Sequence, residues 1–283
     1  MCNLNRFVSL TLTLLLCVTV SGRSAADAVK ESSTQYGFGV VPQFSALEIV
    51  AIWRPILNEL EHMTGLRFRL SGSDSIPAFE KEFTAGRFDF VYMNPYHFVH
   101  AQRSQGYRPL VRDVGRTLFG ILVVARESQV DSIDQLHGQV VAFPSPNALG
   151  ASLLPRAQFL REKIEIKPLY VRSHSSVYLN VALGKAVAGG GVQKTLEQQP
   201  QQIQDALRVI YRTQEVVSHP IAVHPRVPEE LKERVTTALL ALGQTGSGRE
   251  MLAKVPMERI GPASSDDYRA LQALGLDHLV EDW

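Results

Sequence analysis

Three short segments place polar and aromatic side chains between a run typical of a strand and a run typical of a helix. They are YMNPYHF (92–98), FPSPNALGAS (143–152) and RSHSSVY (172–178). The first N–H groups of a helix have no intrahelical acceptor, and the helix dipole adds positive charge at that end. A helix start therefore favours an anion or a small polar ligand, and ligands of open α/β sheets bind beyond the carboxyl ends of the strands. We expect these segments to contribute to one binding site.

Helix capping without any ligand is the alternative interpretation of each segment. Ser173 and Ser175 are good N-cap residues whatever the function. An isolated histidine such as His174 is more often a structural or surface residue than a ligand contact. Asn94 either donates its amide to a ligand or sets the turn before Pro95, a residue suited to the first turn of a helix. The occurrence of three such segments in one chain favours the binding interpretation.

The sequence lacks the common motifs of nucleotide-binding and hydrolytic enzymes. It has neither a P-loop nor a Gly-x-Ser-x-Gly motif, and EHMTG (61–65) has no second histidine at the spacing of a zinc-binding helix. AGGGV (188–192) does not match the dinucleotide fingerprint, so its expected role is to let a helix or a ligand approach the backbone closely. A hydrolase built from His174, Ser175 and a distant carboxylate is the catalytic alternative. We expect no enzyme, no metal and no other cofactor.

Residues 1–28 have the three-part form of a secretory signal segment. A basic residue precedes the apolar run 7–20, and small residues that suit signal cleavage follow at 26–28. The apolar run is shorter than the ~20 residues that a membrane-spanning helix needs. Lipidation at Cys17 is the alternative to cleavage. Because Cys2 and Cys17 are the two cysteines of the chain, we expect an exported protein without thiol, disulfide or cysteine metal site.

The charge balance of the exported chain argues against polyanionic partners. The segment 1–28 contains two arginines and one aspartate, so 27 basic and 27 acidic residues remain of the 29 and 28 in the whole chain. An excess of basic residues would be expected for a protein that binds nucleic acid or an anionic membrane surface. We therefore expect an exported protein without a nucleic-acid partner, and we expect it to be a monomer.

The elements that must position these residues follow from the hydrophobic periodicity, which alternates between about 2 and about 3.6 residues. This alternation predicts an α/β fold with mostly parallel sheets. Pro55, inside one helical pattern, predicts either a kink or a later helix start. The predicted strands cover 36–42, 66–70, 88–93, 118–126, 139–143, 166–172, 186–192 and 219–224. The predicted helices cover 46–64, 75–86, 95–106, 131–138, 148–163, 175–184 and 228–235, with two short helices after them.

Four stretches, in this order, resemble one protein family. They are FGVVPQ (38–43), FEKEFTAGRFDFVYMNPYHF (79–98), LHGQVVAFPSPNALGASLLP (136–155) and SHSSVYLNVALGKAVAGGG (173–191). They are similar to the periplasmic substrate-binding proteins that serve ABC transporters of phosphate, phosphite and phosphonate. The resemblance covers roughly 36–260, and its most specific part is the run GRFDFVYMNPY.

This resemblance implies a two-lobed periplasmic-binding-protein fold of type II, which closes on its ligand like a flytrap. The implied lobes are 35–117 plus 219–283, and 118–218, joined by strands that cross between them. The implied function is to capture a small oxyanion, such as phosphonate, phosphite or phosphate, in the interlobe cleft and to deliver it to the permease of an ABC importer. The alternative is a periplasmic sensor that presents a different ligand to a membrane kinase.

The family's site residues carry over to this chain only in part. Tyr92 and His174 match a pocket tyrosine and a cleft histidine of the family. A second family tyrosine is Ser75 here, and the family's acidic residue before a proline is His219. The hydroxyl-rich anion loop of phosphonate binders is NALGAS (147–152), which has lost hydroxyl donors and leaves the ligand open. The expected ligand-binding residues are Ser75, Tyr92, Asn94, Asn147, Ser173, His174, Ser175 and His219.

Overall fold

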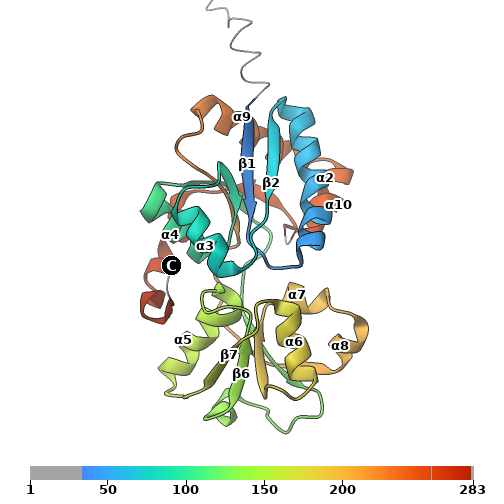
Figure 1. The fold of residues 1–283 in the computed structure, drawn as a ribbon, viewed down its shortest axis with the longest axis vertical. Helices are drawn as coiled ribbons and strands as arrows, with labels where there is room; N and C mark the ends of the chain where they lie inside the picture. Colours follow the sequence, from blue (N-terminus) through green and yellow to red (C-terminus); the bar gives the residue numbers. More distant parts are fainter. Residues whose placement is uncertain (1–33, 256, 282–283) are drawn as a thin grey trace, which may run out of the picture.

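The computed structural model describes residues 34–255 and 257–281 and places them in two α/β lobes, one above the other in Figure 1. The proposed signal segment 1–28 lies outside the described residues, and so do both cysteines. Within the part of the chain that is described, no helix is long and apolar enough to cross a membrane. Each lobe is built around its own sheet.

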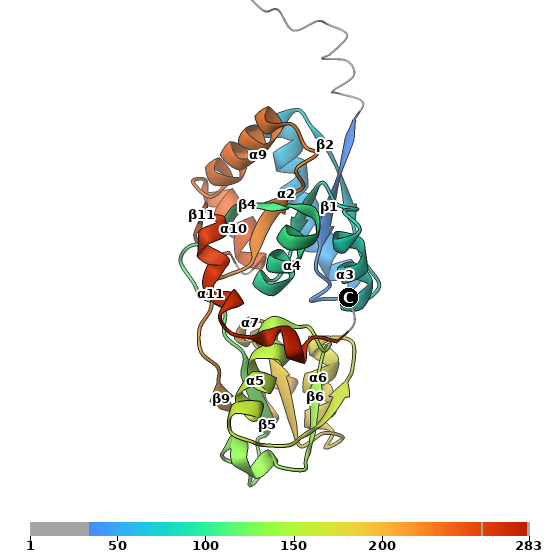
Figure 2. The same cartoon turned by 90° about the vertical axis from the view of Figure 1, so that its left-hand side faces the viewer.

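The first lobe, the upper one in Figures 1 and 2, contains a six-stranded mixed sheet in the order β11-β4-β10-β3-β1-β2. β1 is parallel to β2 and β3, whereas β10 is antiparallel to β3 and β4, and β11 is antiparallel to β4. The strands are β1 Gln35–Val40, β2 Arg67–Ser71, β3 Phe90–Tyr92, β4 Arg108–Asp113, β10 Pro220–Val223 and β11 Ile260–Pro262. The helices are α2 Ala46–Thr64, α3 Ile76–Thr84, α4 Pro95–Gln105, α9 Glu229–Leu242, α10 Gly246–Lys254 and α11 Arg269–Gln272, with 3-10 turns η3 Ser265–Tyr268 and η4 Leu276–Leu279.

The second lobe contains a five-stranded mixed sheet in the order β7-β6-β8-β5-β9. β6 is parallel to β7 and β8, and β5 is antiparallel to β8 and β9. The strands are β5 Ile121–Ala125, β6 Val140–Phe143, β7 Lys167–Tyr170, β8 Ala188–Gly191 and β9 Leu207–Arg212. The other elements are the 3-10 turn η1 Ile133–Leu136, the π-helix η2 Leu149–Leu153, α5 Leu154–Arg161, α6 His174–Ala182, α7 Gln193–Glu197 and α8 Gln201–Asp205.

Both sheets are mixed, so the prediction of mostly parallel sheets is wrong. The antiparallel strands β4, β9 and β11 were not predicted from the sequence. β4 (RPLVRD) and β9 (LRVIYR) begin or end with charged residues, and β11 has three residues, so their apolar patterns are short. The strands that run opposite to the rest of their sheet are β10 and β11 in the first lobe and β5 in the second. β5 and β10 each follow a segment that crosses between the lobes, and local periodicity does not reveal such a crossing.

Helix α2 shows how local signals and packing combine. Ser45 caps its start in a capping box with Glu48, and Gly65, in the left-handed region at φ 70°, ends it as predicted. The helix nevertheless runs through Pro55, so a later start is wrong. Proline has no backbone N–H, and the burial of the apolar face of the helix compensates for the hydrogen bond lost at Pro55. Five hydrophobic residues on this face are buried: Ile49, Trp53, Ile56, Leu57 and Leu60.

Two extended segments, 114–120 and 213–219, connect the lobes. They are joined by an antiparallel bridge in which the backbone N–H groups of Leu118 and Val216 each donate to the other residue's carbonyl at 2.8 Å. Beside it, the Gly120 N–H donates to the Thr213 hydroxyl at 2.8 Å. This pairing gives a two-stranded connection at which the lobes can rotate.

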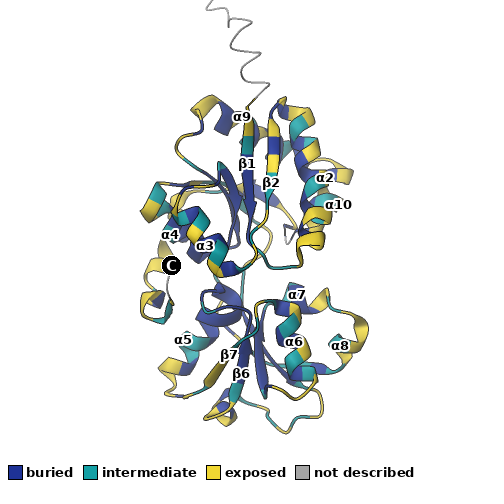
Figure 3. Cartoon of the chain, in the orientation of Figure 1, coloured by how far each residue is buried: buried dark blue, intermediate teal, exposed yellow. Residues whose placement is uncertain are grey.

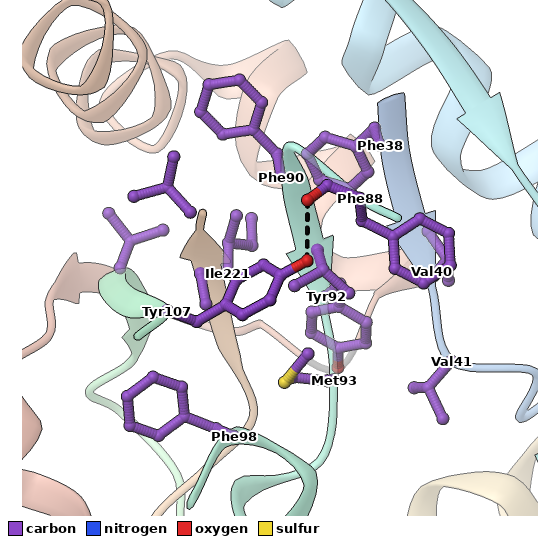
Figure 4. Packing of buried hydrophobic residues seen from close by; sticks show 14 of the residues in the cluster. Phe38, Val40, Val41, Phe88, Phe90, Tyr92, Met93, Phe98, Tyr107 and Ile221 are labelled. Carbon is purple, nitrogen blue, oxygen red and sulfur yellow. Dashed lines mark hydrogen bonds between the residues drawn. The ribbon is translucent and has the colours of Figure 1, made fainter. Parts of the chain in front are cut away.

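The most specific motif of the sequence lies in the core of the first lobe. Figure 3 shows that the central strands of both sheets are buried, while the outer faces of the helices and edge strands such as β7 are exposed. β3 is central in its sheet, and Phe90, Val91 and Tyr92 are all buried. Figure 4 shows Phe90 and Tyr92 in the same hydrophobic cluster as Phe38 of β1. The carboxyl end of β3, which leads to α4, therefore has a rigid base.

Candidate functional site

Four helix starts meet where the two lobes face each other: those of α3 and α4 in the first lobe and those of η2 and α6 in the second. A cavity of about 20 Å³ lies between them. Its polar lining comes from Gln43, Asn94, His174 and His219, and its apolar lining includes Ile76. A volume of this size is about that needed for one water molecule. The cleft is therefore closed.

Three of the predicted site residues act as helix caps in this arrangement. The Asn94 side chain accepts a hydrogen bond from the His97 N–H at 2.8 Å, at the start of α4. Ser75 caps α3 and Ser173 caps α6 in the same way. Ser175 does not cap; it is exposed in the first turn of α6. The caps fix the directions in which the helix starts point, and Asn94 also lines the cavity.

Tyr92 and His219 form a stacked pair at the carboxyl end of β3. Their ring centroids are 5.3 Å apart with an interplanar angle of 21°. Gln43 contacts the same imidazole, with 2.9 Å between its Nε2 and the His219 Nε2. Because an amide nitrogen donates, the His219 Nε2 accepts here, and the ring carries its proton on Nδ1.

The hydroxyl of Tyr92 is a buried donor without an acceptor among the described residues. Burial, and then the negative charge of Asp113, raise the pKa of Tyr92 far above its ordinary value, so the hydroxyl keeps its proton. A buried hydroxyl without a partner costs about 1–3 kcal/mol. Native structures keep such groups where a ligand or an ordered water completes them.

His174 completes the polar lining from the second lobe. It is the first residue of α6, it is buried, and its Nδ1 lies 3.3 Å from the Thr195 hydroxyl. Burial lowers the pKa of His174 to about 4. Burial, with the charges of His97 and His174, lowers the pKa of His219 to about 3. Both imidazoles are thus neutral near pH 7, and the site can hold an anion only through uncharged donors and helix starts.

The lowered pKa values of the two imidazoles predict that the protein becomes less stable as the pH falls. Both imidazoles have an ordinary pKa of 6.5 when unfolded and lower values when folded, so the unfolded chain binds more protons between pH 6.5 and about 4. The free energy of unfolding should fall by roughly 1–2 kcal/mol per imidazole between pH 7 and pH 5. Urea denaturation at both pH values measures this loss. The variant His174→Gln should show a smaller loss than the wild type, and an equal loss would contradict the assignment.

Asn147 is engaged by protein groups rather than by the cavity. Its Nδ2 donates to the Glu80 carboxylate at 3.1 Å and to the Glu281 carbonyl at 2.8 Å, and its Oδ1 accepts from the Glu281 N–H at 3.1 Å. Glu80 is itself fully buried and lies 2.9 Å from the His97 Nε2. Asn147 therefore joins the second lobe to two parts of the first.

The C-terminal segment continues this connection between the lobes. η4 itself packs against α5 of the second lobe, where Figure 2 shows the C-terminal part of the chain. The Glu281 carboxylate accepts a hydrogen bond from the Tyr170 hydroxyl at 2.7 Å and pairs with Arg156 at 3.3 Å. These contacts attach the C-terminal segment to the second lobe, and the Asn147–Glu80 hydrogen bond links the second lobe to α3 of the first, so together they favour the arrangement seen here.

The glycines of AGGGV allow close packing, as the sequence predicted. A Cβ atom on Gly190 would lie 1.9 Å from the Ala151 carbonyl oxygen of η2, and one on Gly191 would lie 2.1 Å from the Tyr178 hydroxyl of α6. Just before the neighbouring strand β5, a Cβ atom on Gly120 would lie 1.9 Å from the Gly150 carbonyl oxygen. The π-helix that lines the cavity is thus seated directly on the backbone of β8 and of the residue before β5.

Sequence reasoning missed several polar groups of this region. Gln43 follows β1 at the same sheet edge at which Tyr92 ends β3, and that shared position was an available signal. Ser145 and Ser152 are buried and have hydroxyls with no hydrogen-bond partner among the described residues, so the loop 143–152 retains hydroxyl groups at other positions. No group of three or more His, Cys, Asp or Glu residues that could hold a metal occurs in the described ranges.

Comparisons with known proteins agree with this geometry. The family described as the periplasmic substrate-binding protein of phosphonate ABC transporters matches residues 38–268. A structure of PhnD1 from Prochlorococcus marinus in complex with methylphosphonate is 17% identical, over 85% of this chain and 97% of that one, with a TM-score of 0.78. A binding protein component of an ABC phosphonate transporter from Pseudomonas aeruginosa is 16% identical, over 85% of each chain, with a TM-score of 0.77. A Xanthomonas citri protein bound to ATP is 18% identical, over 87% of this chain and 98% of that one, with a TM-score of 0.71. The predicted two-lobed fold is confirmed.

Proposed function

We propose that this chain, which belongs to the family of periplasmic substrate-binding proteins of phosphonate ABC transporters, captures a phosphonate or a related phosphorus oxyanion between its lobes and delivers it to an importer. The family consists of substrate-binding transport proteins and not of enzymes, so the hydrolase alternative is set aside. The family is periplasmic, and we propose that residues 1–28 direct export and are then removed.

The observation that carries this proposal is the buried Tyr92 hydroxyl, which has no acceptor among the described residues. Tyr92 ends a central strand and stacks on the neutral imidazole of His219, which lines the cavity between the four helix starts. A phosphonate oxygen would accept from this hydroxyl, and hydrogen bonds to an anion are stronger than those to a neutral acceptor. A site with neutral imidazoles would thus hold the oxyanion through hydrogen bonds from this hydroxyl and from the helix starts.

Binding requires the lobes to move, because the closed cavity has a volume of about 20 Å³ and is too small for a phosphonate. We propose that the lobes rotate about the paired segments 114–120 and 213–219, admit the ligand and close again. Tyr92, His174 and His219 would contact the oxyanion, while Ser75, Asn94 and Ser173 would hold the helix starts around it. Ser175 would lie at the mouth, and Asn147 would stabilise closure.

A thermal-shift screen of the purified protein tests the ligand class. The panel contains phosphate, phosphite, methylphosphonate, 2-aminoethylphosphonate, sulfate and small carboxylates. At a concentration of about one hundred times Kd, a ligand of the folded state adds about 2.7 kcal/mol to the free energy of unfolding, which should raise the midpoint by several degrees. We expect a shift with at least one phosphonate and none with sulfate. Shifts confined to carboxylates or sulfate would refute the proposed ligand class.

Delivery to an importer needs a separate experiment. The protein should associate with its transporter permease in membranes, and the association should be stronger with the ligand that the screen identifies. Ligand-dependent association with a membrane kinase instead would support the sensing alternative.

A further inference from the structure

A second chamber adjoins the cavity on the side of the crossing segments. Its volume is about 370 Å³, against about 20 Å³ for the cavity itself. Gln43, Leu118, Val192 and His219 line both spaces, so the chamber opens directly beside the Tyr92–His219 pair. The wider groove at the mouth of the cleft, of about 850 Å³, shares only Gln43 with the cavity. A substituent on an oxyanion bound in the cavity would therefore reach the chamber more directly than it would reach the groove.

The charges that face this chamber are not balanced. Arg116 and Lys194 line it, together with one carboxylate, that of Glu197. Arg116 forms an ion pair with Glu258. The hydrogen bond and charge of Glu258 raise the pKa of Arg116, and the charge of Glu197 adds to the effect. Of the two carboxylates, Glu258 is paired with Arg116, and Glu197 accepts a hydrogen bond from Gln193.

Lys194 has no such partner. It is half-buried, and among the described residues no carboxylate oxygen lies within 4.0 Å of its ammonium nitrogen. Its neighbour Gln193 donates from Nε2 to Glu197 at 3.1 Å, while the Gln193 Oε1 is buried and accepts no hydrogen bond within the described ranges. A half-buried cation without a counter-charge gains most from an anionic group that enters the chamber.

We infer that the chamber receives the substituent of the bound phosphonate and that Lys194 binds a second anionic group on it, so that the ligand class is a phosphonate that also carries a carboxylate. This inference rests on the proposed function. A substituent that ends in an amine would instead place a further positive charge beside Lys194 and Arg116. Lys194 is in this sense a specificity-determining residue, because it acts on the substituent and not on the phosphonate head.

Isothermal titration with three phosphonates of similar length tests the inference: phosphonoacetate, ethylphosphonate and 2-aminoethylphosphonate, which end in an anion, a neutral group and a cation. In the wild type, phosphonoacetate should bind at least about tenfold more tightly than the other two. Lys194→Gln should remove most of this preference and leave the affinity for ethylphosphonate unchanged. Lys194→Glu should reverse the order, so that 2-aminoethylphosphonate binds most tightly.

Lys185→Glu provides the matched control, because it makes the same change of net charge at an exposed position between α6 and β8. It should leave all three affinities as in the wild type. If phosphonates bind but the wild type does not distinguish the three ligands, or if Lys194→Glu changes their order no more than Lys185→Glu does, the inference is refuted while the proposed function stands. If none of the phosphonates binds, the proposed function fails and the inference fails with it.

Discussion

Replacing Gly190 with alanine should lower the free energy of unfolding by about 3 kcal/mol and weaken ligand binding at least tenfold. The new Cβ atom would lie 1.9 Å from the Ala151 carbonyl oxygen and 2.6 Å from the Phe143 ring. Neither neighbour is the end of a flexible side chain, so the strand or the π-helix η2 must move. Adding atoms to a well-packed core typically costs 1–3 kcal/mol, and a backbone contact of this kind lies at the upper end.

The loss of binding follows from the position of η2. Gly150 and Ala151 line the cavity, so a displaced η2 no longer presents its first N–H groups to the ligand. Urea denaturation and titration with the ligand from the screen measure the two effects. Gly246→Ala is the control, because its Cβ would meet nothing within 4 Å at the start of α10. It should not lower the free energy of unfolding and should leave binding unchanged. A Gly190→Ala protein as stable as the wild type would show that η2 is not held against β8.

The sequence allowed the strand ends and helix starts of the site to be predicted, because those features are local. Turn residues, helix caps and apolar periodicity predicted most of the helices and strands. The run around β3 predicted the core strand that carries Tyr92. Gly65 and Gly106 adopt the left-handed conformation at the ends of α2 and α4, where glycine has no Cβ penalty.

Contacts between distant segments could not be predicted in the same way. Asn147 and Glu281 are 134 residues apart, and nothing in either neighbourhood indicates their pairing. Glu80 lies on the apolar stripe of α3, where a charge is unusual, and its burial depends on His97 and Asn147, which are distant in the sequence. Lys194 precedes a glutamine-rich segment, 196–204, whose sequence indicates no site, and the chamber that Lys194 lines exists only because the crossing segments pass next to α7.

Replacing Tyr92 with phenylalanine should have opposite effects on stability and on binding. Without ligand, the free energy of unfolding should rise by about 1 kcal/mol, because the variant no longer buries a hydroxyl that lacks a partner among the described residues. The ring still packs against Trp53, at 4.9 Å between centroids, and against His219. Binding of a phosphonate should weaken at least tenfold, because one charge-assisted hydrogen bond is worth about 1.5–3 kcal/mol.

Tyr107→Phe is the matched control in the same core. Figure 4 shows both tyrosines, and the Tyr107 hydroxyl donates to the Phe88 carbonyl at 2.7 Å. Its removal leaves a buried carbonyl without that donor, so the Tyr107→Phe protein should be less stable by about 1 kcal/mol and should bind as the wild type does. Chemical denaturation without ligand and titration with methylphosphonate give both quantities for each variant. If Tyr92→Phe instead lost stability and kept its affinity, as a purely structural tyrosine would, the oxyanion would have to bind elsewhere in the cleft. Opposite signs in the two variants would assign the buried hydroxyl of Tyr92 to the ligand, since packing alone affects the two rings alike.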